Sequence, residues 1–279
     1  MRKTKVFIIG GNGFIGSEIV SEFAHEEVEV VIPARNELIA GNSEKDIIIY
    51  CAGNGDCSKP EQVVDSNINY LQRILAYCNF KKLIYLSSTR LYLNSEISNE
   101  DAAITIHSED SRRLFNLTKL TAEECCLKSE KNTLIVRPSN VYGKAFDSKL
   151  FLPMIVKHAI LNKKINMYVD KDYSKDYVSV SDVAGVVKYL ALNYNSKNDI
   201  FNIASGQNTT AFEIANIIQS KINCEIVWNE NSTKEQFPVI NISKIKGIMQ
   251  YIPSSITDDL SLMIDEFIER FQKEIQDDH

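Results

Sequence analysis

The chain has 279 residues, of which 44% are hydrophobic and 24% charged, a composition typical of a globular protein with a large core. The formal net charge of -6 and the lack of a basic stripe exclude broad electrostatic binding to nucleic acid, which needs clustered cations. The sequence has neither a signal-peptide pattern nor an apolar run near the length of a membrane span, so we expect a cytoplasmic protein without membrane contact. The six cysteines are scattered without zinc-ligand spacing, so we expect reduced core thiols and no metal site.

The first half of the chain alternates short apolar runs with helical patterns of apolar residues. Runs that suit buried strands lie at 6–9, 28–32, 47–51, 83–87 and 134–137. Between them, helical periodicity covers 14–24, a stretch that begins at Pro60, and 112–128. Repeated strand-helix units of this kind predict an α/β fold with a Rossmann-type, doubly wound parallel sheet.

After Gly143 this alternation loosens. Helices are expected near 150–161, 182–192, 210–222 and 256–275, and strands near 165–169 and 200–204. We therefore expect a sheet domain of residues 1–145, to which 180–204 return, and a smaller α/β lobe made of 146–179 and 205–279.

A glycine-rich turn lies directly between the first expected strand and the first expected helix. Glycine lets the main chain approach a pyrophosphate, which then sits at the positive end of the following helix. A plain tight turn is the alternative, and the flanking strand and helix disfavour it. The turn predicts dinucleotide binding by the sheet domain, through Gly10, Gly11, Asn12, Gly13, Phe14, Ile15 and Gly16.

The end of the second strand normally selects between the two nicotinamide dinucleotides. An acidic residue there accepts the ribose hydroxyls of NAD, whereas an arginine accommodates the 2′-phosphate of NADP. Here the strand runs into Pro33-Ala34-Arg35-Asn36 without an acid at that point. We therefore expect NADP (NADPH), with Arg35 as the phosphate ligand. The alternative is that Arg35 is a solvated surface residue and NAD binds.

Several further segments follow the glycine turn in a fixed order. They are Asn67, Ser-Ser-Thr-Arg-Leu-Tyr at 87–92, Leu-Ile-Val-Arg-Pro-Ser-Asn-Val-Tyr-Gly at 134–143, Lys-Asp-Tyr-Val-Ser-Val-Ser-Asp-Val at 175–183, and Phe-Asn-Ile-Ala-Ser-Gly at 201–206. In this order they resemble the extended short-chain dehydrogenase/reductase family, in its NAD-dependent epimerase/dehydratase branch, which acts on sugar nucleotides. The resemblance covers most of the chain.

The resemblance implies a catalytic group with one member missing. A Ser or Thr four residues before the Tyr of the Ser-Ser segment assists catalysis in the family; this position is Ser88, and Thr89 beside it is a second candidate. The family's Tyr-x-x-x-Lys motif places a phenol and an ammonium one helical turn apart, and the ammonium lowers the phenol pKa so that Tyr can pass a proton. The matching positions are Phe115 and Lys119, so the amine is present and the phenol is absent.

Phenylalanine keeps the ring of tyrosine but has no proton to give or take. Loss of a general acid or base costs about two to four powers of ten in rate. Because the elements that serve the phenol remain, we interpret Phe115 as a replacement that disables an enzyme whose normal residue is Tyr. The alternative is a natural relative with altered or lost chemistry. His107 in a nearby loop is a candidate substitute for the missing proton carrier. The alternative, a solvated loop histidine without this role, is the commoner case.

The resemblance also implies further binding residues. Asn140 and Lys175 stand where relatives bind the diphosphate and nucleotide of a sugar nucleotide, and Ser88 stands beside the sugar. Lys175 replaces the usual arginine, which keeps the charge but loses the bidentate fork, and a solvated surface lysine is the alternative. Asp147, Ser148 and Lys149 begin the smaller lobe and are expected to reach the hexose or the base. The implied cofactor contacts beyond the glycine turn are Arg35, Cys51, Ala52, Gly53, Asn67, Lys119, Arg137 and Pro138.

The family's dehydratases carry Asp-Glu directly after the catalytic Thr, whereas Ser88 is followed by Thr89-Arg90, so dehydration is disfavoured. The short connection before residue 47 is typical of the small reductases. Together with Arg35, it favours NADPH-dependent reduction of a keto group on a nucleotide-activated deoxy sugar of the 4-keto-6-deoxy type, for cell-surface polysaccharide biosynthesis. An NAD-dependent sugar-nucleotide epimerase and a non-catalytic NADP-binding sensor remain as alternatives. The resemblance also implies a homodimer formed through the helices near 60–78 and 112–128.

Overall fold

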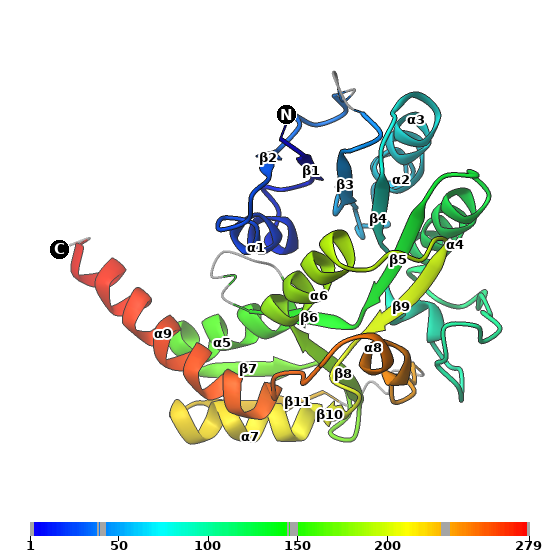
Figure 1. Cartoon of the computed structure of the whole chain (residues 1–279). Helices are drawn as coiled ribbons and strands as arrows, with labels where there is room; N and C mark the ends of the chain where they lie inside the picture. The colour runs from blue at the N-terminus through cyan, green and yellow to red at the C-terminus, as the bar shows by residue number, and fades with distance from the viewer. Residues whose placement is uncertain are drawn as a thin grey trace.

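The computed structural model describes residues 3–37, 39, 43–143, 145, 150–229 and 235–277, with side chains up to residue 271. Within these ranges the centre of the fold is a six-stranded sheet in the order β2-β1-β3-β4-β5-β9, with each neighbouring pair parallel (Figure 1). The predicted Rossmann-type fold is thereby confirmed. The strands are β1 (Lys5–Ile9), β2 (Glu29–Val31), β3 (Ile47–Tyr50), β4 (Lys82–Leu86), β5 (Thr133–Pro138) and β9 (Asp199–Ile203).

Helices cover both faces of this sheet. On one face lie α1 (Phe14–Glu22) and α6 (Val180–Leu192), and on the other lie α3 (Tyr70–Tyr77) and α4 (Arg113–Leu127) (Figure 1). Because the sheet is covered on both faces, every residue of β3, β4 and β5 is buried. This is why the predicted strands appear in the sequence as continuous apolar runs rather than as alternating ones.

The helix that begins at Pro60 is interrupted by a wider turn. It consists of α2 (Pro60–Val64), a π-helical turn (Asp65–Asn69) and α3, where the periodicity predicts one uniform helix. The π turn carries Asn67, whose fully buried amide bonds the main chain of Asn54 through both its oxygen and its nitrogen, at 3.0 and 3.1 Å. Its nitrogen also donates to the Thr118 hydroxyl at 2.9 Å. Asn67 thus ties the loop after β3 to α4.

The chain reverses its direction of travel across the sheet at β1. From β1 the chain crosses to β2 on one side, and β3 then pairs with the other side of β1. In open parallel sheets such a switch point leaves a crevice outside the carboxyl ends of the two strands. The glycine turn after β1 and the loop after β3 therefore face the same crevice.

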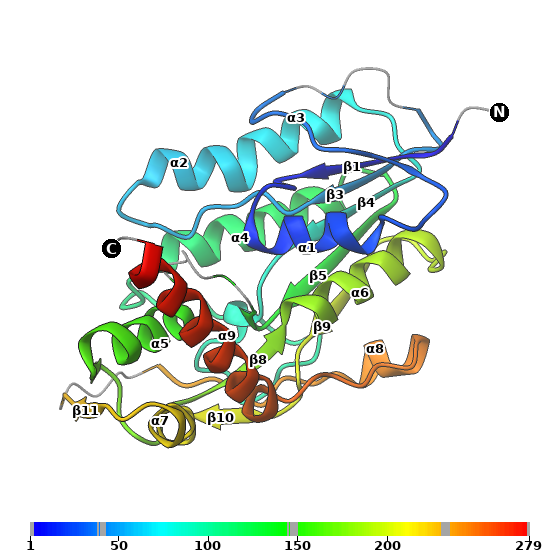
Figure 2. The same cartoon turned by 90° about the vertical axis from the view of Figure 1, so that its left-hand side faces the viewer.

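A smaller lobe lies beside the carboxyl end of the sheet (Figure 2). It contains the sheets β10-β8-β6 and β11-β7 and has its own apolar core, which includes Ile165, Ile218 and Phe267. Its short strands carry too few residues to give a clear period, and most of them were not predicted. The elements are β6 (Asn140–Tyr142), α5 (Phe151–Asn162), β7 (Lys164–Met167), β8 (Ser174–Ser179), β10 (Asn208–Thr210), α7 (Ala211–Lys221), β11 (Glu225–Trp228) and α9 (Ile256–Asp277). The helix α8 (Ser243–Ile248) lies between them in sequence but packs against β9 of the central sheet.

In the described part of the chain, no helix combines the length and the apolar character that a membrane crossing requires. All six cysteines fall within this part; Cys78, Cys126 and Cys224 are buried, and Cys51, Cys57 and Cys125 are half-buried.

A buried ion pair joins α4 to the central sheet. Arg137 on β5 bonds both carboxylate oxygens of Glu123 on α4, through Nε at 2.9 Å and through Nη2 at 2.6 Å. The two side chains are only 4% and 3% exposed. Arg137 also donates to the Tyr92 hydroxyl and to the Glu100 carbonyl. The pair fixes the position of α4, because an unpaired charge at this depth is very unfavourable.

We predict that Glu123→Gln lowers the free energy of unfolding by about 3 kcal/mol, because the substitution leaves the buried guanidinium without its counter-charge. Urea denaturation measures the change. The matched control is Asp265→Asn, which breaks the exposed Lys221–Asp265 pair and should cost less than about 1 kcal/mol. Similar small losses in both variants would contradict the role of the buried pair.

Candidate active site

A cavity of about 390 Å³, here called the glycine-turn cavity, opens at the switch point of the sheet. It is bounded by the turn after β1, the residues after β2, the loop after β3 and one side of the α2–α3 helix. The structure therefore brings together most of the residues expected to contact a dinucleotide. These are Gly10, Gly11, Asn12, Gly13, Arg35, Cys51, Ala52 and Gly53.

Two glycines are required by close main-chain contacts. Gly10 has a φ of +82°, and a Cβ atom there would lie 2.8 Å from the Ala52 nitrogen. A Cβ atom on Gly16 would lie 2.1 Å from the Gly10 carbonyl oxygen. Phe14, Ile15 and Gly16 form the start of α1, and no side chain caps this helix. An uncapped helix N-terminus behind a turn without side chains suits a pyrophosphate.

Arg35 is exposed at the mouth of the glycine-turn cavity, in the turn after β2. The sequence also has an acid two positions later, Glu37, but its carboxylate accepts a hydrogen bond from the Ala34 main chain at 2.7 Å. Asn36 donates to Asp65 at 3.2 Å, which ties the turn to the π-helical turn. The guanidinium of Arg35 is thus the charged group presented at the position that selects between the two dinucleotides.

Lys119 and Phe115 lie one helical turn apart on α4, beside the loop after β3. The buried Lys119 amine donates to the Leu86 carbonyl at 2.7 Å, at the carboxyl end of β4. A Cβ atom built on Gly53, which lines the glycine-turn cavity, would lie 3.4 Å from this amine, so Lys119 lies directly behind this part of the cavity wall. Burial lowers the pKa of Lys119 to about 8. The amine is 5.7 Å from the centre of the half-buried Phe115 ring.

Ser88 follows β4 at the same edge of the sheet. Its hydroxyl oxygen accepts a hydrogen bond from the Arg90 main chain at 3.1 Å and so caps a short 3-10 helix, Thr89–Tyr92. The hydroxyl proton is not used in this contact and can be donated to a bound oxygen. Thr89 is more deeply buried than Ser88, so Ser88 is the better placed hydroxyl.

Three expected cofactor residues lie behind the cavity rather than on its surface. Asn67 uses its amide to join the loop after β3 to α4. Arg137 uses its guanidinium for Glu123, Tyr92 and the Glu100 carbonyl, and Pro138 ends β5, paired with Ile203. The side chains of Asn67 and Arg137 are thus engaged by the fold, and their contact with a cofactor stays a prediction.

A second cavity, of about 420 Å³, lies between the sheet domain and the smaller lobe and is here called the cationic cavity. Arg112, Asn140 and Lys175 line one part of it together with Tyr173, Tyr177 and the acidic Glu235. Mostly apolar residues, among them the start of α5, line the rest. The two expected substrate residues, Asn140 and Lys175, are therefore brought together. The Asn140 amide donates to the Asp176 carbonyl at 2.8 Å. Asp147, Ser148 and Lys149 lie outside the described residues.

Lys175 is held among aromatic rings rather than in solvent. Its amine lies 4.8 Å from the Tyr173 ring centre and 4.9 Å from that of Phe237. Burial lowers the pKa of Lys175 to about 8; Arg90 and Arg112 add to the lowering, and Glu235 opposes it. Lys175 is therefore not the freely solvated surface lysine that was the alternative.

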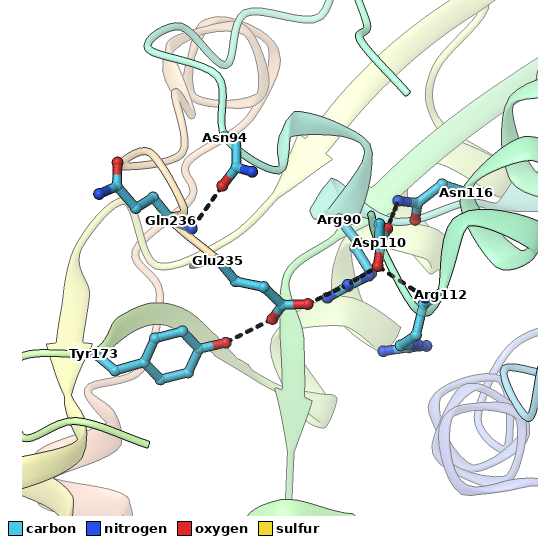
Figure 3. Close-up of polar contacts among 8 residues, drawn as sticks. All are labelled: Arg90, Asn94, Asp110, Arg112, Asn116, Tyr173, Glu235 and Gln236. Atoms are coloured by element: carbon cyan, nitrogen blue, oxygen red, sulfur yellow. Dashed lines mark hydrogen bonds and ion pairs between the residues drawn. The ribbon is translucent and has the colours of Figure 1, made fainter. Parts of the chain in front are cut away.

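A polar network that the sequence did not predict closes one side of the cationic cavity (Figure 3). The Arg90 guanidinium donates to Asp110 at 2.7 Å and to Glu235 at 2.5 Å, and the Tyr173 hydroxyl donates to Glu235 at 2.9 Å. The network joins the loop after β4, the start of α4 and the segment before α8. These segments are far apart in sequence, so no local pattern could have indicated the network.

The site contains no phenol at position 115. The nearest phenol ring to Lys119 among the contacts of its amine is that of Tyr85 on β4, 4.9 Å away, and the Tyr85 hydroxyl is buried. His107 is half-buried, and its Nε2 atom reaches neither solvent nor a hydrogen-bond partner among the described residues, so it is not the solvated histidine that loops usually carry. The arrangement presents an anion-binding turn, a buried ammonium, a serine hydroxyl and a cationic cavity. It can bind and orient an anionic substrate beside a dinucleotide.

Comparison with known proteins places this geometry in a family. Residues 6–204 match the model of the NAD dependent epimerase/dehydratase family. The UDP-glucose 4-epimerase of Mycoplasma genitalium is 25% identical over 338 residues, which cover 96% of this chain and 97% of that protein. The dTDP-4-dehydro-6-deoxyglucose reductase of Escherichia coli is 22% identical over 305 residues, with 92% and 95% covered.

Solved structures share the fold at lower identity. MoeE5 in complex with UDP-glucuronic acid and NAD has a TM-score of 0.82 at 18% identity, and the likeness covers 95% of this chain and 99% of MoeE5. RMD from Pseudomonas aeruginosa in complex with NADPH has a TM-score of 0.74 at 19% identity, with 96% and 99% covered. The chain belongs to the NAD-dependent epimerase/dehydratase family of extended short-chain dehydrogenases/reductases, whose members modify sugar nucleotides.

Proposed function

We propose that this site is that of an NADPH-dependent reductase acting on a keto group of a nucleotide-activated deoxy sugar, of the 4-keto-6-deoxy type, with its proton-donating tyrosine replaced by Phe115. The proposal is carried by the position of α4. Lys119 and Phe115 lie beside the loop after β3, part of which lines the glycine-turn cavity, and Arg112, three residues before Phe115, lines the cationic cavity. In this proposal residues 1–145 and 180–204 bind the dinucleotide. Residues 146–179 and 205–279 complete the sugar-nucleotide site.

The glycine-turn cavity supports a dinucleotide because a tightly packed glycine turn leads into the start of α1, which no side chain caps. Arg35 at its mouth favours the 2′-phosphate of NADP over NAD. The bound reduced cofactor would supply a hydride to the sugar carbonyl carbon. Cell-surface polysaccharide biosynthesis is the expected use of the product.

Three side chains of this chain would act on the sugar or its surroundings. Ser88 donates its free hydroxyl proton in a hydrogen bond to the carbonyl oxygen, which stabilises the developing negative charge. Lys119, fixed by the Leu86 carbonyl, holds a positive charge beside the same region below about pH 8. Phe115 fills the place of the proton donor and supplies no proton, so the chain as it stands should bind substrate and turn it over slowly.

Phe115 also favours a second candidate, a protein that binds NADP and catalyses nothing. Such a sensor should bind the dinucleotide but show no affinity for nucleotide-linked sugars. The cationic cavity argues for a second anionic ligand and therefore for the enzyme.

An NAD-dependent epimerase is the remaining alternative. Such an enzyme would retain its nicotinamide cofactor and convert sugars without net redox change.

A homodimer stays a prediction from the family. The helices expected to form its interface, α2–α3 and α4, lie on the same face of the sheet. They leave Tyr77 and Leu117 exposed, at 76% and 42%. These apolar side chains are consistent with a partner on this face.

We predict that Phe115→Tyr raises the rate of NADPH oxidation with a suitable 4-keto-6-deoxy sugar nucleotide by about two to four powers of ten, because it restores a titratable proton beside Lys119. Absorbance of the reduced cofactor measures the rate with dTDP-, CDP-, UDP- and GDP-linked substrates. Phe115→Leu is the control, since it changes the ring without adding a phenol. Failure of the tyrosine variant to oxidise NADPH with every substrate would count against reduction.

For cofactor selection, Arg35→Ala should weaken NADPH binding by about tenfold, because it removes a charge-assisted contact to the 2′-phosphate. NADH binding to the same variant should change less than about twofold and serves as the internal control. Titration by fluorescence of the reduced nicotinamide gives both affinities. Equal changes for the two cofactors would remove Arg35 from cofactor selection.

The lowered pKa of Lys175 predicts a pH dependence for sugar-nucleotide binding. Below about pH 8 the free protein already carries the charged amine, whereas above it binding of an anion must first take up a proton. Affinity for a nucleoside diphosphate should therefore fall as the pH rises from 7.5 to 9.5, by at most about tenfold per pH unit. Lys175→Arg stays charged and should show a flat profile. The same decline in both proteins would exclude Lys175 as its origin.

A further inference from the structure

Arg112 lies between the cationic cavity and the Phe115 ring. It directly precedes α4 and lines the cationic cavity, and its guanidinium carbon is 4.7 Å from the centre of the Phe115 ring. A Cβ atom built on Gly55, in the loop after β3, would lie 2.8 Å from an Arg112 guanidinium nitrogen. The guanidinium thus lies between the loop after β3 and Phe115, the position of the family's catalytic tyrosine.

The charge of Arg112 is not neutralised by the protein. Among the described residues, none forms a hydrogen bond or an ion pair with its guanidinium, which lies against the Phe115 ring and Gly55. The nearby carboxylates of Asp110 and Glu235 are instead bound by Arg90, and Glu235 also accepts from Tyr173. Figure 3 shows the Arg112 side chain directed away from the Asp110 carboxylate. This carboxylate accepts a hydrogen bond from the main-chain nitrogen of Arg112 and not from its guanidinium.

The position of Arg112 is nevertheless fixed. Asp110 accepts from the Arg112 main chain at 2.8 Å and from the Asn116 amide at 2.7 Å, and the buried Arg90 holds Asp110 in turn. These contacts set the start of α4 and hence the point from which the guanidinium extends. A fixed main chain with an unpaired guanidinium is typical of an anion-binding residue, because arginine matches phosphate oxygens with paired donors.

Arg112 and Lys175 face the cationic cavity from the two parts of the molecule. Lys175 extends from β8 of the smaller lobe, whereas Arg112 belongs to the sheet domain. Their mutual repulsion is one of the causes that lower the pKa of Lys175, as expected for cations that share one cavity. A ligand with two adjacent negative charges would relieve this repulsion.

We propose that Arg112 binds the diphosphate of the sugar nucleotide at the end that carries the sugar, and that Arg112 and Lys175 together hold this diphosphate between the two lobes. The inference rests on the proposed sugar-nucleotide function and adds a ligand that the family motifs do not assign. Arg112 receives the sugar end because it lies against Phe115, next to which the reacting carbon must stand. Lys175 then contacts the rest of the diphosphate.

Isothermal titration calorimetry of the whole chain with UDP, dTDP, CDP and GDP tests this inference without any need for catalysis. For the diphosphate that binds best, Arg112→Ala should weaken binding by about tenfold or more, and Arg112→Lys should weaken it less. Binding of the matching monophosphate should change less, because it lacks the distal phosphate. The control is Arg113→Ala, at the adjacent exposed arginine whose side chain donates to the Ser108 carbonyl, and it should stay within about twofold.

NADPH binding by Arg112→Ala should remain within about twofold of the unchanged chain, which also verifies that the variant is folded. Unchanged diphosphate binding in this variant would overturn the inference and leave the proposed reductase standing. A loss for NADPH as large as that for the diphosphate would also overturn it, since Arg112 would then serve the cofactor. If the unchanged chain binds none of the diphosphates, both the inference and the proposed substrate class are wrong.

Discussion

Parallel strands that end at one edge of a sheet are the constraint on which this site depends. Because β1 is the switch point, the turn after β1 and the loop after β3 border one crevice, and β4 ends beside them with Ser88. The bond from Lys119 to the Leu86 carbonyl ties α4 to the same edge. The buried Arg137–Glu123 pair fixes the helix further along its length. Residues from four separate segments of the chain thereby lie close together at the carboxyl edge of the sheet.

The charges of the protein are distributed unevenly between fold and site. Arg137 and Arg90 are paired with carboxylates and hold segments of the chain together. Lys119, Lys175 and Arg112 instead have no carboxylate bonded to them among the described residues. Burial without a counter-charge is unfavourable, and it lowers the pKa of both lysines. Such unpaired cations are most often found where a ligand supplies the missing charge.

Phe115 changes the chemistry of the site while preserving its packing. The aromatic ring lies between the Arg112 guanidinium and the Lys119 amine, so both cations have a favourable neighbour in the absence of a phenol. The anion-binding turn, the serine hydroxyl and the cationic cavity do not depend on a proton at this position. Membership in a family of sugar-nucleotide enzymes is therefore compatible with a chain that binds its ligands well and lacks one catalytic step.

The sequence by itself determined the fold class and most of the glycine-turn cavity, because buried strands, helical periods and glycine spacing are local patterns of a few residues. It also indicated Asn140 and Lys175, which the structure brings to one cavity. Only the tertiary structure decided that Asn67 and Arg137 support the site from behind, since their partners lie 13 to 51 positions away. The same holds for Arg112, whose role depends on Arg90 and Glu235, which are 145 positions apart. Local patterns record which face of an element is buried, whereas the partner of a charged side chain is fixed only when distant segments pack together.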